Sequence, residues 1–163
     1  VHFRHHEVVG AKMTKRILQE LKYDKKTIKD VALLVELHLR PHTFKMGWTD
    51  SAVRRYIVDA GTVLDDLNNL VRADVTTKNK QKAQEIYDKL DEMENKIKDV
   101  LEKEEMSKLR PPITGDEIME IFNLEPGPKV GLIMKALYEQ RINEGEVSKE
   151  DAIKLAEDIF KNL

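Results

Sequence analysis

Residues 78–109 read KNKQKAQEIYDKLDEMENKIKDVLEKEEMSKL, and this segment is the strongest indicator of a helical fold. Its apolar residues recur at alternating steps of four and three positions, which places them on one face of a long helix: Ile86, Leu90, Met93, Ile97 and Val100. This seam covers barely two heptads before Glu104, so we expect it to pack against helices of the same chain. A helical module that self-associates through the seam is the alternative.

Helical periodicity continues on both sides of this segment. From residue 7 to residue 21, the expected inward face of a helix is traced by Val8, Ala11, Ile17, Leu18 and Leu21. Further helices are expected at about 24–39, 49–61, 62–74, 114–124, 128–142 and from 148 onward. No stretch alternates Val, Ile and Thr as a strand would, so the chain is predicted to be all-α, a bundle of about seven helices.

Capping residues and prolines mark the ends of these helices. N-caps are expected at Asp24, Thr49, Thr114 and Ser148. Glu117 follows Thr114 at the spacing of a capping box. Pro111 and Pro112 make the clearest internal break. We therefore expect three regions: a helical region at 1–76, a long connecting helix at 77–110 and a C-terminal helical tail at 111–163.

The composition limits the kinds of site that the chain can contain. It is 40% hydrophobic and 36% charged with a single Trp, which favours exposed helices over a thick sheet core. The absence of cysteine excludes a disulfide framework and a thiolate zinc site. The sequence has no apolar run of membrane-spanning length and no signal-peptide pattern, which predicts a cytoplasmic protein with no membrane partner.

The formal net charge of −2 conceals an asymmetry along the chain. Residues 1–110 contain 22 Lys and Arg against 19 Asp and Glu, whereas residues 111–163 contain 6 against 11. A polyanion such as RNA would prefer the first part, because phosphate contacts dominate the affinity of proteins for nucleic acids. A solvated surface of well-mixed charges is the alternative interpretation.

All five histidines lie within the first 42 residues: His2, His5, His6, His38 and His42. Antiparallel packing of the expected helices would bring His6, His38 and Asp74 to one end of a bundle. Two imidazoles and a carboxylate suit a divalent metal, so these three residues are the candidate ligands. For His38 the alternative is a half-buried histidine held by one hydrogen bond. The histidines begin at position 2 and the chain opens on Val1, so we interpret the chain as the trailing part of a larger protein.

The segment from Asp74 to the start of the long helix is basic. It places Lys78, Lys80 and Lys82 at a helix N-terminus, where lysines oppose the helix dipole at a cost of about 0.3 kcal/mol each. An anion docked on the free N–H groups would offset that cost. Arg54, Arg55 and Arg72 would extend the same basic surface. The predicted RNA-binding residues are the three lysines together with Arg54 and Arg55. A solvated helix start is the alternative.

Several motifs, taken together and in order, resemble known families. HEVVGA at 6–11 and LVELHLR at 34–40 resemble the latter half of an HD phosphohydrolase-like domain. WTDSAVRR at 48–55 and RADVTTKN at 72–79 look like the continuation found in bacterial CCA-adding tRNA nucleotidyltransferases of the poly(A) polymerase family. RPPITGDEIM at 110–119 and PGPKVG at 126–131 resemble the C-terminal signature of that family.

The resemblance implies a parent enzyme that adds C, C and A to tRNA 3′ ends from CTP and ATP with magnesium. It places catalysis in an N-terminal nucleotidyltransferase head with a Gly-Ser pair and an Asp-x-Asp motif, neither of which occurs in this sequence. We therefore expect this chain to hold the tRNA acceptor stem against that head, without catalytic residues or a cofactor of its own and without activity when alone.

The resemblance also bears on the histidines. The first His and the His-Asp pair of an HD domain would precede Val1, which leaves His6, His38 and Asp74 as matching positions with weak metal affinity. A metal-dependent HD-type phosphohydrolase acting on phosphoesters or cyclic nucleotides is the alternative function. It predicts a bound metal and phosphodiesterase activity.

Overall fold

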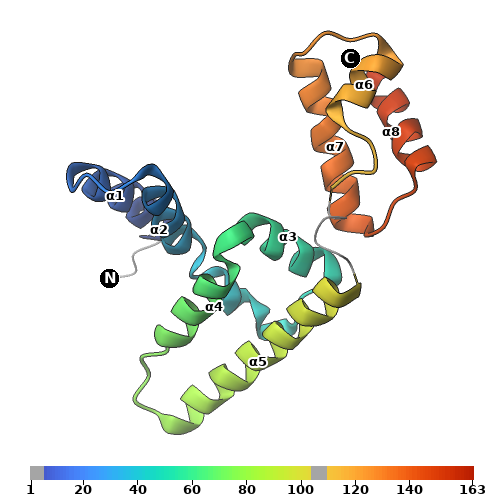
Figure 1. Ribbon diagram of the computed structural model, residues 1–163. Helices are drawn as coiled ribbons and strands as arrows, with labels where there is room; N and C mark the ends of the chain where they lie inside the picture. The colour runs from blue at the N-terminus through green and yellow to red at the C-terminus, as the bar shows by residue number, and fades with distance from the viewer. Residues whose placement is uncertain (1–5, 104–109) are drawn as a thin grey trace. The chain divides into compact units, whose positions relative to one another are not determined.

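The computed structural model describes residues 6–103 and 110–163, apart from the side chains at positions 45 and 46. Every regular element in that part is a helix, which confirms the all-α prediction (Figure 1). The chain forms two compact units, one of Val1–Trp48 with Tyr56–Ile97 and one of Thr49–Arg55 with Lys98–Leu163. Outside the described residues lie His2, His5 and the expected end of the long helix at 104–109. The three-region division at 76 and 110 stays a prediction.

Among the described residues, the first unit contains five complete helical elements and parts of two more. These are α1 (His6–Glu20), α2 (Lys25–Leu37), the 3-10 segments η1 (Arg40–Met46) and η2 (Gly61–Val63), α4 (Leu64–Ala73), the end of α3 (Asp50–Ala60) and most of α5 (Lys80–Lys103). Asp24 caps α2 as expected, because its carboxylate accepts the N–H groups of Lys26 and Thr27 at 2.9 and 3.0 Å. The core of this unit includes the fully buried side chains Tyr56, Ile57, Leu67 and Met93.

The segment Arg40–Met46, which lies between the helices expected at 24–39 and 49–61, is the 3-10 helix η1. Pro41 sits in its first turn, where the fixed φ of proline suits a helix start. The ring centroid of Trp48 lies 5.5 Å from that of Phe44 and 5.0 Å from that of Tyr56. The indole N–H of Trp48 donates to Thr43 Oγ1 at 3.2 Å. An aromatic cluster therefore holds η1 in place against the unit.

The second unit contains the C-terminal helices α6 (Gly115–Phe122), α7 (Pro128–Glu144) and α8 (Lys149–Lys161). The expected capping box is present: Thr114 Oγ1 accepts Glu117 N–H at 3.2 Å, and Glu117 Oε2 accepts Thr114 N–H at 2.7 Å. The three helices pack side by side (Figure 1) around a buried apolar cluster of Ile113, Ile118, Ile133, Leu137, Ala152 and Ala156.

The inward face expected for the first helix is largely wrong. Of its five apolar residues, Ala11 is buried at 3% exposure, whereas Val8, Ile17 and Leu21 are 42–63% exposed. Helix α1 packs on α2, and a Cβ added at Gly10 would meet Val35 Cγ1 at 3.1 Å. The two helices therefore approach each other closely at Gly10, whereas Val8, Ile17 and Leu21 remain exposed.

The seam of the long helix is buried within the chain. Leu90, Met93, Ile97 and Val100 are each at most 5% exposed, as expected for packing against helices of the same chain. Four of the five apolar side chains of the seam therefore already have intramolecular partners, and self-association through the seam stays an untested alternative.

Candidate nucleic-acid interface

The start of α5 is built by a side-chain cap that leaves its lysines in solvent. Asn79 Oδ1 accepts the N–H of Lys82 at 3.1 Å, and the Asn79 carbonyl accepts the N–H of Ala83 at 2.9 Å, so Asn79 is the N-cap. Lys78, Lys80 and Lys82 are exposed, and their side chains form no hydrogen bond or ion pair with any residue that the structure describes. Three uncompensated ammonium groups at a helix N-terminus attract phosphate.

Arg54 and Arg55, the other two predicted RNA contacts, are engaged by α7 within the second unit. Arg54 Nη1 donates to the carbonyl of Ile142 at 3.2 Å. The Arg55 guanidinium donates to both carboxylate oxygens of Glu139, at 3.3 and 2.7 Å. The hydrogen bonds from Arg55 hold the pKa of the Glu139 carboxyl below the ordinary value of a glutamate. Any role of these arginines in RNA binding has to compete with these contacts, so it stays a prediction.

Arg72, expected to extend the same basic surface, instead joins α4 to α5. Its Nε donates to Glu94 at 2.8 Å and its Nη2 to Asp91. The hydrogen bonds to Glu94 and then Asp91 raise the pKa of Arg72 above its ordinary value. The side chain is 30% exposed, and both carboxylates neutralise it. We therefore assign Arg72 to the packing of α4 on α5.

The structure brings together two of the three candidate metal ligands. The rings of His6, in the first turn of α1, and His38, the C-cap of α2, have centroids 5.6 Å apart. His38 is half-buried and its Nδ1 lies 2.6 Å from the carbonyl of Val35, which fits the alternative interpretation of this histidine. Asp74 is the exposed C-cap of α4. Within residues 6–103 and 110–163, no group of three His, Cys, Asp or Glu could hold a metal ion, so the metal site stays a prediction.

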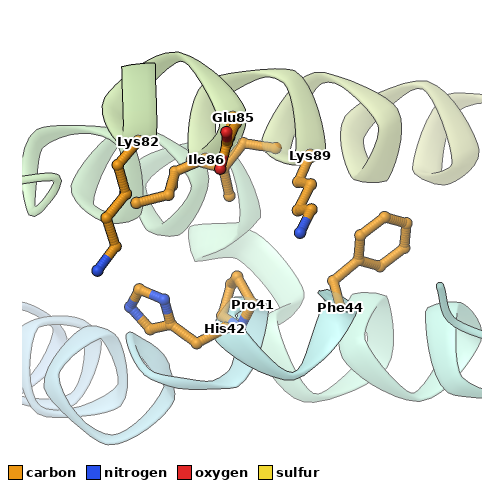
Figure 2. A pocket seen from close by; sticks show the side chains of 8 residues that line it. Pro41, His42, Phe44, Lys82, Glu85, Ile86 and Lys89 are labelled. Carbon is orange, nitrogen blue, oxygen red and sulfur yellow. The ribbon is translucent and has the colours of Figure 1, made fainter. Parts of the chain in front are cut away.

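A pocket of about 230 Å³ between η1 and α5 was missed by sequence reasoning. Its lining residues are Pro41, His42, Phe44, Lys82, Glu85, Ile86, Lys89 and Leu90 (Figure 2). The five from α5 follow the i, i+3, i+4, i+7, i+8 pattern of one helix face, a signal present in the sequence. The contribution of η1 had no such signal, because its approach to α5 is a tertiary contact.

Comparison with known proteins identifies relatives along most of the chain. Residues 7–156 match the family described as tRNA nucleotidyltransferase domain 2, putative. A CC-adding tRNA nucleotidyltransferase of Thermus thermophilus is 33% identical over 92% of this chain and 32% of its own length. An A-adding tRNA nucleotidyltransferase of Deinococcus radiodurans is 31% identical over 85% of this chain and 31% of its own length. The chain thus spans about a third of the length of these curated relatives.

No solved structure matches the chain significantly. Among the helices that the structure describes, none combines the length and the apolar character needed to cross a membrane.

Proposed function

This chain belongs to the tRNA nucleotidyltransferase family, and on that premise we propose that it is a helical body that binds tRNA and positions it for nucleotide addition. The observation that carries the proposal is the family match over residues 7–156, which covers both units. The two relatives are named for adding CC and A to tRNA. In the proposal, this chain shares their substrate.

The proposed contact with the tRNA backbone is made first by Lys78, Lys80 and Lys82. They are the candidate cations without a carboxylate or carbonyl partner among the described residues. A folded RNA helix presents phosphates and 2′-hydroxyl groups, and proteins recognise it mainly by its shape and backbone. Exposed lysines on flexible stems suit that task, because they bind phosphate as point charges without reading bases. Arg54 and Arg55 are proposed as additional contacts.

In the proposal, the chemistry belongs to a nucleotidyltransferase head of the same protein and not to this chain. The parent transfers C, C and A from CTP and ATP to the tRNA 3′ end, and magnesium acts in the head. This sequence contains neither a Gly-Ser pair nor an Asp-x-Asp triplet. Its proposed contribution is to fix the acceptor end, since holding a reacting group in the correct geometry removes much of the entropic barrier.

Titration of tRNA into the 163-residue chain tests the proposal. We expect binding at low salt that weakens as salt rises, because released counterions drive phosphate contacts. Absence of binding at low salt would overturn the proposal.

One observation favours a second function, a metal-dependent HD-type phosphohydrolase: the rings of His6 and His38 lie 5.6 Å apart. It would need a third ligand, which the described residues do not place beside them. Metal analysis of the purified chain, with phosphodiesterase assays of the wild type and His38→Ala, tests it. Tightly bound metal with activity that His38→Ala abolishes would favour this function over tRNA positioning.

A further inference from the structure

The pocket between η1 and α5 combines an apolar floor with a cationic rim. Pro41, Phe44 and Leu90 are buried and Ile86 is half-buried, so the floor is hydrocarbon and aromatic. Lys82 and Lys89 extend from α5 toward η1 on either side of Pro41, and Lys82 lies on the same side as His42 (Figure 2). All lining residues belong to the first unit, so the pocket is formed within one compact body.

The charges on the rim favour an anionic ligand. Lys82 and Lys89 are exposed and have no hydrogen-bond or ion-pair partner in the described part of the chain. Glu85 is the carboxylate that lines the pocket beside them. Two ammonium groups against one carboxylate leave a positive balance next to an apolar floor. Such a pair of features suits a ligand that is flat and apolar at one end and anionic at the other.

The volume of the pocket restricts the size of the ligand group that can enter it. At about 230 Å³ the pocket is smaller than the range of about 300–1,000 Å³ typical of small-molecule sites, so a single ring system enters while the rest of the ligand stays outside. Lys82 and Lys89 are seven residues apart on α5, which separates their Cα atoms by about 10 Å along the helix axis. A nucleotide within an RNA strand has a phosphate on each side of its base, and these two lysines flank the pocket in the same way.

We propose that this pocket binds one unpaired nucleotide, with its base between the floor and the His42 ring and its flanking phosphates at Lys82 and Lys89. Aromatic side chains at such sites stack with any base, because every base has a π-face. Lys82 would then contribute both to the backbone contact and to this pocket. The inference rests on the proposed function in one respect, namely that the strand is RNA.

The test is an NMR titration of the 163-residue chain that follows the His42 ring and the Ile86 methyl groups. The probes are AMP, hexaadenylate and, as a ligand without a base, ribose 5-phosphate. AMP and hexaadenylate are expected to shift both sets of signals, whereas ribose 5-phosphate leaves them in place. A shift with hexaadenylate alone would assign the site to a nucleotide within a strand, and a shift with AMP would show that a free mononucleotide also enters.

Variants separate the pocket from general attraction of anions. His42→Ala is expected to weaken hexaadenylate binding about tenfold, equivalent to about 1.4 kcal/mol, because the stacking ring is lost. Lys89→Gln is expected to weaken it several-fold, and Glu85→Gln to strengthen it by removing the opposing carboxylate. Lys98→Gln, an exposed lysine of the same helix outside the pocket, is the matched control and is expected to bind normally. Circular dichroism establishes that each variant is folded.

The inference is overturned if neither AMP nor hexaadenylate shifts the His42 and Ile86 signals, or if His42→Ala and Lys98→Gln bind equally well. Its failure differs from failure of the proposed function. If tRNA binds while the pocket signals stay unchanged, the pocket inference alone fails. If hexaadenylate binds in the pocket while tRNA does not bind at all, the tRNA-positioning proposal alone fails.

Discussion

The guanidinium of Arg55 donates to both carboxylate oxygens of Glu139, 84 positions later in the sequence, at 3.3 and 2.7 Å. This two-point contact fits the planar fork of arginine to a carboxylate. It joins the middle of α3 to α7 inside the second unit. Arg55 is therefore a structural contact in the unbound chain, and its proposed contact with RNA has to displace Glu139.

Removal of that carboxylate should strengthen tRNA binding. We expect Glu139→Ala to raise the affinity about threefold, because the substitution removes a negative charge and the acceptor that engages Arg55. Fluorescence anisotropy with labelled tRNA measures the change. The matched control is Glu150→Ala, which removes an exposed carboxylate of the same unit that has no partner among the described residues. Equal effects of the two variants would show that only net charge matters and would remove Arg55 from the interface.

Arg72 is expected to stabilise the first unit by joining α4 to α5. Replacement by Ala should lower the free energy of unfolding by about 1–2 kcal/mol, since it leaves the half-buried Glu94 and the more exposed Asp91 without their cation. Urea denaturation measures the difference. Arg16→Ala is the control, because Arg16 pairs with Glu20 across an exposed helix surface and should change stability by less than about 0.5 kcal/mol. Equal losses from both variants would contradict this role.

The capping box of α6 should make the second unit sensitive to acid. Hydrogen bonds from the Lys149 ammonium and from Thr114 lower the pKa of Glu117 from 4.5 to about 2. A carboxyl whose pKa is lower in the folded state stabilises the fold above its unfolded pKa, and that stabilisation is lost as pH falls from about 5 toward about 2. NMR titration of the Glu117 carboxyl carbon measures the folded value.

Lys149→Ala provides the companion measurement, because the Lys149 ammonium lies 2.6 Å from Glu117 Oε1. The variant should raise the pKa of Glu117 toward its ordinary value while leaving Thr114 as N-cap. A Glu117 titration near 4.5 in the wild type, or no change in Lys149→Ala, would contradict the contact.

Features set by neighbouring residues were predictable from the sequence, whereas contacts between distant segments were not. Thr114 and Glu117 lie three positions apart, so their capping box follows from local spacing, as do the caps at Asp24 and Ser148. Periodicity also identified the buried seam of α5 around Met93.

Local spacing failed to predict three features of the structure. Spacing could not reveal that Glu139 engages Arg55, because 84 positions separate them. It also could not reveal that His42 would face α5 and complete a pocket. In α1, periodicity identified an apolar stripe, but not that Gly10 would lie close to Val35 while Val8 and Leu21 stayed exposed.

The proposed contact of the start of α5 with the tRNA backbone can be measured by a salt-dependent tRNA titration of the 163-residue chain. Three phosphate contacts predict that affinity falls about 40-fold between about 50 and about 200 mM salt. Simultaneous replacement of Lys78, Lys80 and Lys82 by Glu should weaken tRNA binding by about 100-fold or more. It should also reduce the slope of log affinity against log salt by the amount that about three phosphate contacts contribute.

The matched control reverses three exposed lysines of α1 and α2 in the same unit, namely Lys12, Lys15 and Lys25. This variant makes the same change in net charge. Its expected loss of tRNA affinity, about threefold, measures long-range electrostatics alone. We expect a large loss of affinity and of salt dependence in the α5 variant only. Equal losses in both triple variants, or an α5 variant that binds tRNA as the wild type does, would contradict it.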